Sequence, residues 1–198
     1  MLLTADKIFN GSEFLTDTSL EIVDGKIARF HPKVLPGAQK LCGILSAGLI
    51  DVQVNGGGGR LFNFAPEVTT LKTMVQAHAR FGTTAMLPTL ITDKVGVMQQ
   101  AANAVSDALR QNIPGILGIH FEGPHLSVPK KGVHQANLIR PITDIEKAIF
   151  CRSDLGLKIV TLALETVPDQ DIQWLLANQV KVAIGHSNAD YDRVRQVL

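Results

Sequence analysis

The sequence predicts an α/β fold in which parallel strands alternate with helices from residue 47 onward, preceded by a small β-sheet in residues 1–46. An apolar run at 48–54 is nearly continuous, as in a strand that is buried on both faces. Helix-like and strand-like segments then alternate regularly, which is typical of parallel strands joined by helical crossovers. The two parts therefore differ in their pattern, and we expect two domains, 1–46 and 47–198.

Residues 1–46 contain short β-like runs separated by turn signals. The runs cover 2–9, 19–23 and 26–30, and they are punctuated by Asn10-Gly11 and Asp24-Gly25. Such dipeptides favour the tight turns of β-hairpins, so we expect a small antiparallel sheet. This subdomain is interpreted as structural because it holds no cluster of catalytic residue types.

The alternating pattern predicts about five strand-helix units in residues 47–198. Further strands are expected at 83–87, 115–120, 157–164 and 180–184, and helices over 68–80, after a cap at Thr92 or Asp93, after the capping box Thr143-x-x-Glu146, over 169–178 and from Asp190. Five strands can complete an open doubly wound sheet, whereas a (β/α)8 barrel typically needs about 250 residues. The pattern alone leaves two interpretations, an open sheet or a fragment of a barrel.

Composition favours a small-molecule partner. The 198 residues are 45% hydrophobic and include 19 basic and 18 acidic side chains, so there is no strong field to recruit nucleic acid or an acidic membrane. The two cysteines lie far apart and form neither a disulfide framework nor a thiolate metal site. With no bilayer-length apolar run and no secretion signal, we expect a cytoplasmic protein without membrane partners.

Polar residues gather where predicted strands end, which is where parallel α/β folds place their sites. Gln53 and Asn55 lie two residues apart, so strand alternation directs both to one side. Neutral amides are poor ligands for transition metals, and a polar strand end is an equally good interpretation. The glycines at 56–59 lack the Lys-Ser/Thr of a phosphate-binding loop, which disfavours a nucleotide site.

The stretch from His120 to His134 carries the densest polar cluster. His120 and Glu122 fall on one side of a strand, followed by His125 and, after a lysine pair, by His134. A glutamate at a strand end is often only a hydrogen-bonded structural acid, but this one lies between histidines. His134 is a candidate substrate donor or general acid, although the pattern does not decide between that role and a solvated loop.

His186 follows the last predicted strand within Gly-His-Ser-Asn. It is placed to be a metal ligand or a base, and equally to be a buried histidine with satisfied hydrogen bonds. Glu122 and His186 together form an incomplete zinc site, because catalytic zinc usually takes three protein ligands and a water. The residues alone leave the third ligand unidentified.

These motifs resemble those of the N-acetylglucosamine-6-phosphate deacetylases, a family of the amidohydrolase superfamily. The matching segments follow the family's order and extend over essentially the whole chain. They are GLIDVQVNGGGG at 48–59, GTTAMLPTL at 82–90, GIHFEGPHLS at 118–127, KKGVH at 130–134, TLALE at 161–165 and IGHSNA at 184–189.

The resemblance implies a (β/α)8 TIM-type barrel with a small β-subdomain at its N-terminus, and it implies roles for single residues. Glu122 resembles the family's metal-binding glutamate, and His186 resembles its first metal-binding histidine. His134 resembles the histidine that contacts the sugar and polarises the acetyl carbonyl. Gln53 and Asn55 stand where two-metal amidohydrolases carry an HxH pair, which implies a single metal and places both residues in the substrate site.

The implied reaction is hydrolysis of the acetamide of N-acetylglucosamine 6-phosphate to glucosamine 6-phosphate and acetate, in amino-sugar catabolism. It would use one divalent metal, expected to be Zn²⁺, with Fe²⁺, Mn²⁺ and Co²⁺ as alternatives. The family's second metal histidine, its catalytic aspartate and its phosphate-holding residues are expected beyond residue 198. The chain is therefore expected to be an incomplete barrel, inactive alone, from a protein that is a homodimer at full length.

Two other functions stay open at this point. One is a non-catalytic fragment or assembly module, which the missing third ligand suggests. The other is a deacetylase of N-acetylgalactosamine 6-phosphate, since the motifs do not distinguish the two epimers.

Overall fold

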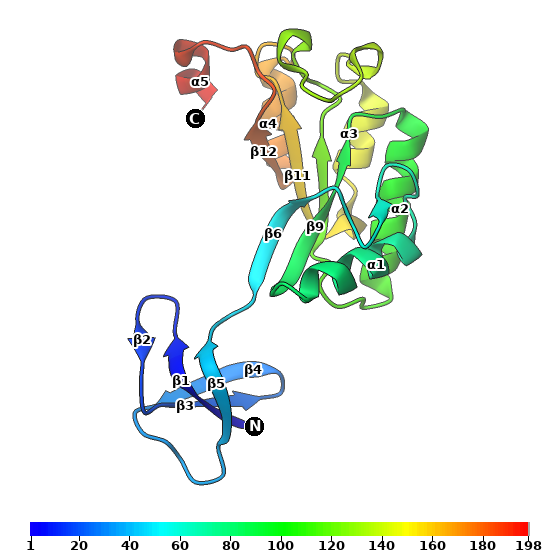
Figure 1. Cartoon of the computed structure of the whole chain (residues 1–198). Coiled ribbons are helices and arrows are strands. Elements are labelled where there is room, and N and C mark those ends of the chain that lie inside the picture. Colours follow the sequence, from blue (N-terminus) through cyan, green and yellow to red (C-terminus); the bar gives the residue numbers. More distant parts are fainter. Residues whose placement is uncertain (198) are drawn as a thin grey trace. The chain divides into compact units, whose positions relative to one another are not determined.

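The computed structural model describes residues 1–197 (Figure 1). The chain divides into two compact units, Met1–Gly48 and Leu49–Leu198, each with a sheet of its own. Among the described residues, none of the helices combines the length and the apolar character that a membrane crossing requires.

The first unit is built from hairpins. Its strands are β1 (Leu2–Phe9), β2 (Phe14–Leu15), β3 (Ser19–Val23), β4 (Lys26–His31) and β5 (Gln39–Leu45). The pairs β1–β2, β1–β3 and β3–β4 are antiparallel, as the turn signals predicted. Asp24 and Gly25 join β3 to β4 with φ of 49° and 72°, the left-handed pair that a type I′ turn needs.

Strand β5 departs from the antiparallel expectation because it runs parallel to β1. No hairpin signal marks this pairing, since a parallel neighbour is reached through a longer connection rather than a tight turn. The small core of the unit is formed by Leu3, Ala5, Ile8 and Leu20.

The second unit contains a five-stranded parallel sheet in the order β12-β11-β10-β9-β6. These strands are β6 (Leu49–Val54), β9 (Thr83–Ile91), β10 (Gly118–Glu122), β11 (Leu157–Leu162) and β12 (Val180–Ile184). Each strand lies beside the one before it in this series, without the reversal of order that defines a doubly wound sheet. The sheet is thus part of a barrel wall, which confirms the incomplete (β/α)8 barrel over the open-sheet alternative.

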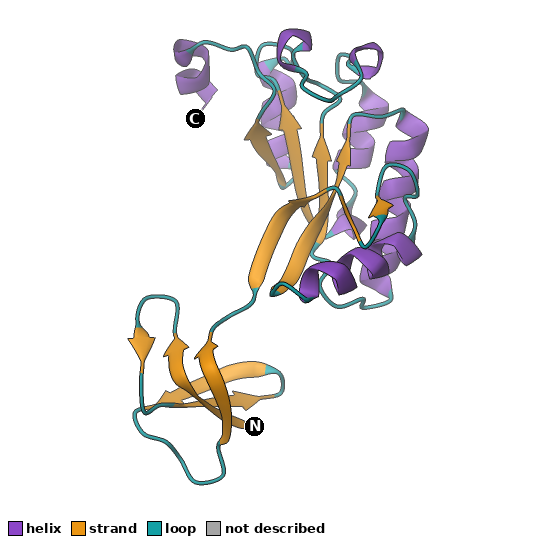
Figure 2. Ribbon diagram, viewed as in Figure 1, coloured by secondary structure: helices purple, strands orange, loops and turns teal. Residues whose placement is uncertain are grey.

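Helices fill the connections between these strands, and one more follows the last strand. They are α1 (Val68–Ala79), α2 (Val95–Arg110), α3 (Asp144–Phe150), α4 (Asp169–Ala177) and α5 (Tyr191–Val197), with 3-10 turns at Val128–Lys130, Ala136–Leu138 and Ser153–Leu155. Figure 2 shows α1, α2 and α3 together on one side of the sheet. The core lies between these layers, where Met98 and Val105 of α2 join Ile119 and Phe121 of β10 in one apolar cluster.

The structure tests the helix caps that the sequence predicted for α3 and α2. The capping box before α3 is confirmed, because the Glu146 carboxylate accepts hydrogen bonds from the Thr143 backbone N–H and hydroxyl at 3.0 and 2.9 Å. The predicted cap of α2 at Thr92 or Asp93 is wrong. The N-cap residue is Lys94, whose side chain makes no capping hydrogen bond. The Thr92 hydroxyl instead forms a hydrogen bond with His134, in the connection that follows β10.

The glycine run at 56–59 forms a tight hairpin, β7 (Gly56–Gly57) with β8 (Arg60–Leu61), packed beside α1. A Cβ added at Gly56 would lie 2.2 Å from the Arg60 carbonyl oxygen. One added at Gly57 would lie 2.9 Å from the His78 ring. Close backbone approach therefore accounts for these glycines.

Strand β6 forms one edge of the parallel sheet, and it exposes apolar side chains there. Leu49, Ile50 and Val52 are 62%, 65% and 51% exposed. Open edges and exposed apolar side chains are what a part of a barrel wall should show, because in a closed barrel a neighbouring strand covers each edge.

Replacing Gly118 with alanine tests the close pairing of β10 with β11. An added Cβ would lie 1.8 Å from the Leu157 carbonyl oxygen, so we expect Gly118→Ala to lower the free energy of unfolding by at least about 2 kcal/mol. Gly96→Ala is the matched control, since a Cβ there meets no atom within 4 Å and α2 should gain up to about 1 kcal/mol. Urea unfolding midpoints measure both changes, and equal midpoints for the two variants would contradict this packing.

Candidate metal centre

Three side chains converge at the C-terminal edge of the parallel sheet. Glu122 is the last residue of β10, His186 follows β12, and His134 lies in the connection from β10 to α3. One potential ligand atom from each lies within 4.8 Å of those from the other two. Glu122 and His134 are buried, whereas the His186 side chain is 26% exposed. Three segments that are distant in sequence thus meet because parallel strands end at one edge.

The His186 ring has a defined orientation. Its Nδ1 lies 2.9 Å from the Lys130 carbonyl oxygen, and its Nε2 lies 3.0 Å from Oε1 of Glu122. A carbonyl can only accept, so Nδ1 carries the proton of the neutral ring and Nε2 presents a lone pair. Two electron-pair donors then face each other across 3.0 Å. A cation between them resolves this opposition, and a carbonyl-bound Nδ1 is the usual support of a metal-ligating histidine.

His134 has a different partner, the hydroxyl of Thr92, which lies 2.8 Å from Nδ1. The same hydroxyl lies 3.4 Å from the Glu122 carbonyl oxygen, so its single proton has two acceptors within reach. When the Thr92 hydroxyl donates over the shorter contact to Nδ1, the ring proton of His134 lies on Nε2, which is 3.8 Å from Oε1 of Glu122; when it donates to the Glu122 carbonyl, Nδ1–H of His134 donates to Thr92 and Nε2 presents a lone pair. In the first tautomer His134 is a hydrogen-bond donor toward the centre, in contrast to His186.

The carboxylate of Glu122 is ionised at neutral pH. The neighbouring His134 ring is the largest influence and lowers the pKa of Glu122, burial opposes it, and a hydrogen bond from the doubly protonated form of the His186 ring lowers the pKa further, to about 2. An ionised carboxylate with an imidazole nitrogen beside it is a donor set that suits a divalent cation such as zinc. The residues therefore fit a divalent metal ion.

Two other histidines of the predicted cluster have structural contacts instead. His120 is buried, with Nδ1 2.9 Å from the Val52 carbonyl oxygen and Nε2 2.7 Å from the Thr161 hydroxyl. It links β6, β10 and β11 inside the sheet, and burial lowers its pKa. His125 is fully buried, with Nδ1 2.9 Å from the Arg140 carbonyl oxygen, and burial lowers its pKa as well.

Gln53 and Asn55 flank the end of β6. Gln53 is exposed, and Asn55 is partly buried directly after the strand. The strand carries an irregularity between Asp51 and Val54, so alternation along it does not by itself place their side chains on one side. Their assignment to substrate binding stays a prediction.

Sequence reasoning missed two supporting residues. Thr92 orients His134, and Glu165, which follows β11, accepts hydrogen bonds from the Ser187 hydroxyl and the Asn188 backbone N–H at 2.5 and 2.6 Å. The sequence held a usable signal for Glu165. This residue shortly follows β11, and β11 lies between the two strands that lead to Glu122 and His186.

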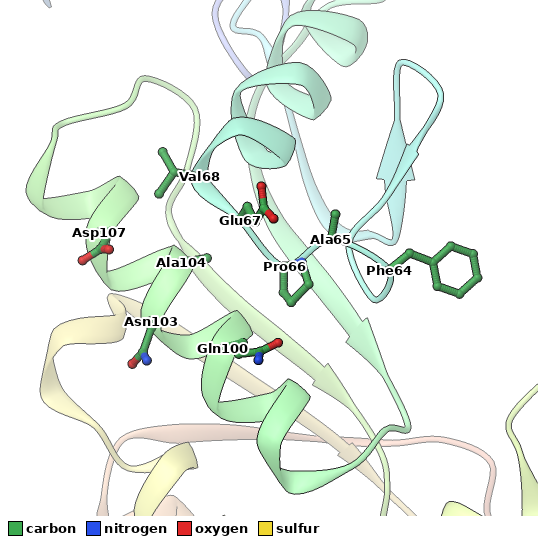
Figure 3. Close-up of a pocket in the computed structure, with 9 residues that line it drawn as sticks. All are labelled: Phe64, Ala65, Pro66, Glu67, Val68, Gln100, Asn103, Ala104 and Asp107. Carbon is green, nitrogen blue, oxygen red and sulfur yellow. The ribbon is translucent and has the colours of Figure 1, made fainter.

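A cavity of about 520 Å³ lies away from this centre, between the segment that precedes α1 and the face of α2 (Figure 3). Its lining includes Pro66, Glu67, Gln100 and Asn103. None of the three converging residues contributes to this lining, so the cavity has no part in the chemistry proposed for them.

The relatives that resemble this chain in sequence are deacetylases of N-acetylhexosamine 6-phosphates. The N-acetylgalactosamine-6-phosphate deacetylase of Shewanella sp. (strain ANA-3) is 44% identical over 206 residues, which cover 100% of this chain and 52% of the relative. The N-acetylglucosamine-6-phosphate deacetylase of Haemophilus influenzae is 34% identical, with 93% of this chain and 50% of the relative covered. No family model matches the chain.

A solved structure gives the same picture. The crystal structure of N-acetylglucosamine-6-phosphate deacetylase from Pasteurella multocida superimposes with a TM-score of 0.91 at 36% identity, over 100% of this chain and 54% of that one. The chain spans about half the length of these relatives.

The pKa of Glu122 gives this centre a testable pH dependence. A carboxylate whose pKa falls from 4.5 to about 2 on folding stabilises the native state above pH 4.5, and this stabilisation is lost as the pH falls through the window down to about 2. In metal-free protein, Glu122→Gln should therefore flatten the loss of stability in that window. Urea unfolding followed by circular dichroism at a series of pH values measures it, and parallel curves for wild type and variant would show that Glu122 is not stabilised in this way.

Proposed function

The chain belongs to the N-acetylhexosamine-6-phosphate deacetylase family and matches the N-terminal part of its members, and from this premise we propose that it supplies the metal-binding half of such an enzyme. The reaction is hydrolysis of the acetamide of N-acetylglucosamine 6-phosphate to glucosamine 6-phosphate and acetate. The observation that carries this proposal is the convergence of Glu122, His134 and His186 at the C-terminal edge of the sheet.

Glu122 and His186 are the proposed metal ligands. The ionised carboxylate and the lone pair on Nε2 of His186 face one site, and the Lys130 carbonyl fixes the ring. We propose Zn²⁺, with Fe²⁺, Mn²⁺ or Co²⁺ as alternatives that accept the same ligands. When bound, such a cation supplies Lewis acidity, which polarises a carbonyl and lowers the pKa of water.

His134 is proposed as the residue that contacts the acetyl carbonyl. With Thr92 donating to Nδ1, the Nε2–H of His134 is available to the carbonyl oxygen and stabilises the negative charge that forms there during hydrolysis. Burial of the ring favours a fixed orientation, because no solvent competes for the hydrogen bond to Thr92.

Gln53 and Asn55 are proposed to complete the substrate site from the end of β6. The resemblance implies that the proton-transferring aspartate and the groups that hold the phosphate lie in the half of the family fold that these 198 residues do not cover. The intact enzyme is proposed to be a cytoplasmic homodimer whose partner is a small amino-sugar phosphate.

A second substrate has specific support. The relative that is 44% identical is named for N-acetylgalactosamine 6-phosphate, whereas the relative that is 34% identical is named for the glucosamine epimer. The two sugars differ in one hydroxyl configuration and share the acetamide and the phosphate. The same centre can therefore serve either substrate.

A chimera tests the proposed function. The 198-residue chain, continued through the C-terminal half of the Shewanella relative, should release acetate from an N-acetylhexosamine 6-phosphate, while the chain alone with added zinc should give only background release. Assaying both epimers identifies the preferred one. Because Glu122 is a proposed ligand, Glu122→Gln in the chimera should abolish turnover and reduce metal content. A well-folded chimera inactive on both epimers, or turnover by the chain alone, would contradict the proposal.

The two histidines should respond differently to substitution. His186→Ala should lower zinc stoichiometry, because it removes a proposed ligand. His134→Ala should keep zinc bound but lower kcat of the chimera by about 100-fold or more, as expected for loss of a hydrogen-bond donor to the forming oxyanion. Elemental analysis and steady-state kinetics measure these effects, and loss of zinc in His134→Ala would make His134 a ligand instead.

A further inference from the structure

Glu165 has no role in the chemistry derived above, yet it stands beside the centre. It follows β11, which lies between β10 and β12 in the sheet, and these neighbours lead to Glu122 and His186 respectively. Its two carboxylate oxygens are both engaged. Oε2 accepts from the Ser187 hydroxyl at 2.5 Å, and Oε1 accepts from the Asn188 backbone N–H at 2.6 Å. Glu165 thus holds the two residues that directly follow His186.

His186 needs such a hold because its backbone is in an unfavourable conformation. Its φ is 50°, in the left-handed region that side chains other than glycine rarely adopt. A residue of this kind persists where surrounding contacts over-determine it, and such residues concentrate at functional sites. On one side the His186 carbonyl accepts a hydrogen bond from the Ser127 backbone N–H at 2.9 Å. On the other side the contacts come from Glu165.

The charge of Glu165 strengthens these contacts. Burial raises its pKa, but hydrogen bonds from Ser187 and Asn188 outweigh burial, and the net change is a lowered pKa. Hydrogen bonds to an ionised acceptor are shorter and roughly twice as strong as neutral ones. Ser187 and Asn188 lie in the connection that follows β12. The carboxylate therefore acts directly on the connection that carries His186.

We propose that Glu165 is a positioning residue that holds His186 in its left-handed conformation and thereby aims Nε2 of His186 at the metal site. The Lys130 carbonyl fixes the rotation of the ring, and Glu165 fixes the backbone from which the ring projects. Without Glu165, the segment 186–188 would relax toward ordinary backbone angles, and Nε2 would leave its place 3.0 Å from Glu122. This inference rests on the metal site of the proposed function.

The test compares substitutions at Glu165 in the 198-residue chain. Glu165→Ala removes both acceptors, whereas Glu165→Gln keeps one carbonyl oxygen for the Asn188 N–H and an amide that can donate to the Ser187 hydroxyl. Glu67→Gln is the control, because Glu67 is exposed and lies outside the centre. Ser187→Ala, which removes one of the two bonds, serves if Glu165→Ala does not fold. Thermal unfolding verifies that each variant is folded.

Two readouts report on the position of His186. The first is amide hydrogen exchange over 186–189 in the metal-free chain, which should be faster in Glu165→Ala and near wild type in Glu165→Gln. The second is titration with Co²⁺, followed by its visible spectrum. Supporting groups of ligating histidines typically contribute 10- to 100-fold to metal affinity, so Glu165→Ala should bind Co²⁺ about tenfold more weakly, with an altered spectrum.

The outcomes separate this inference from the proposed function. Unchanged exchange and unchanged Co²⁺ binding in Glu165→Ala, with wild type binding Co²⁺ normally, would overturn the positioning role and leave the metal site intact. Equal weakening in Glu165→Ala and in Glu67→Gln would overturn it too, because the effect would then be one of charge alone. If the wild-type chain takes up no Co²⁺, the same titration is made in the chimera, and a folded chimera that takes up no Co²⁺ would overturn the proposed metal centre, and the aiming role with it.

Discussion

The contact between Nε2 of His186 and the Glu122 carboxylate is the interaction on which the rest of the centre depends. The Lys130 carbonyl keeps the proton of His186 on the far side of the ring, so a lone pair and a carboxylate face each other at 3.0 Å. With the neutral ring this opposition is unfavourable, and it becomes favourable when a cation lies between the two groups. The positions of these two groups thus define a cation-binding site.

The parallel sheet makes that contact possible. Glu122 and His186 are 64 residues apart in sequence, yet they meet because β10 and β12 end at the same edge with only β11 between them. A sheet in which each strand follows its predecessor brings successive strand ends around a common axis, which is the geometry of a barrel site. Glu165 follows β11, the strand between these two. The residue that we propose to position His186 therefore comes from the same edge of the sheet as the proposed ligands.

Sequence reasoning was most successful where the physical signal is local. The strands at Leu2–Phe9, Ser19–Val23 and Val180–Ile184 and the capping box of Thr143 and Glu146 follow from alternation, turn chemistry and a contact three residues long. It also grouped Glu122 with His186, since strand ends predict a common edge.

The sequence could not show the contacts that decide roles within the group. Thr92 had the pattern of a helix cap, and only its meeting with His134, 42 residues away, reveals its function. The parallel pairing of β5 with β1 likewise leaves no turn signal. The tautomers that distinguish His134 from His186 depend on the Thr92 hydroxyl and the Lys130 carbonyl, which other segments supply. The spacing of residues in the sequence does not predict either contact.

X-ray absorption spectroscopy of the zinc-loaded chain tests the central claim most directly. We expect one zinc per zinc-loaded chain with oxygen and nitrogen ligands at about 2.0–2.2 Å, among them a single imidazole. A spectrum with two imidazoles would contradict the distinct roles of His134 and His186. A folded chimera with the C-terminal half of the Shewanella relative that retains no zinc after removal of the free metal would contradict the metal centre itself.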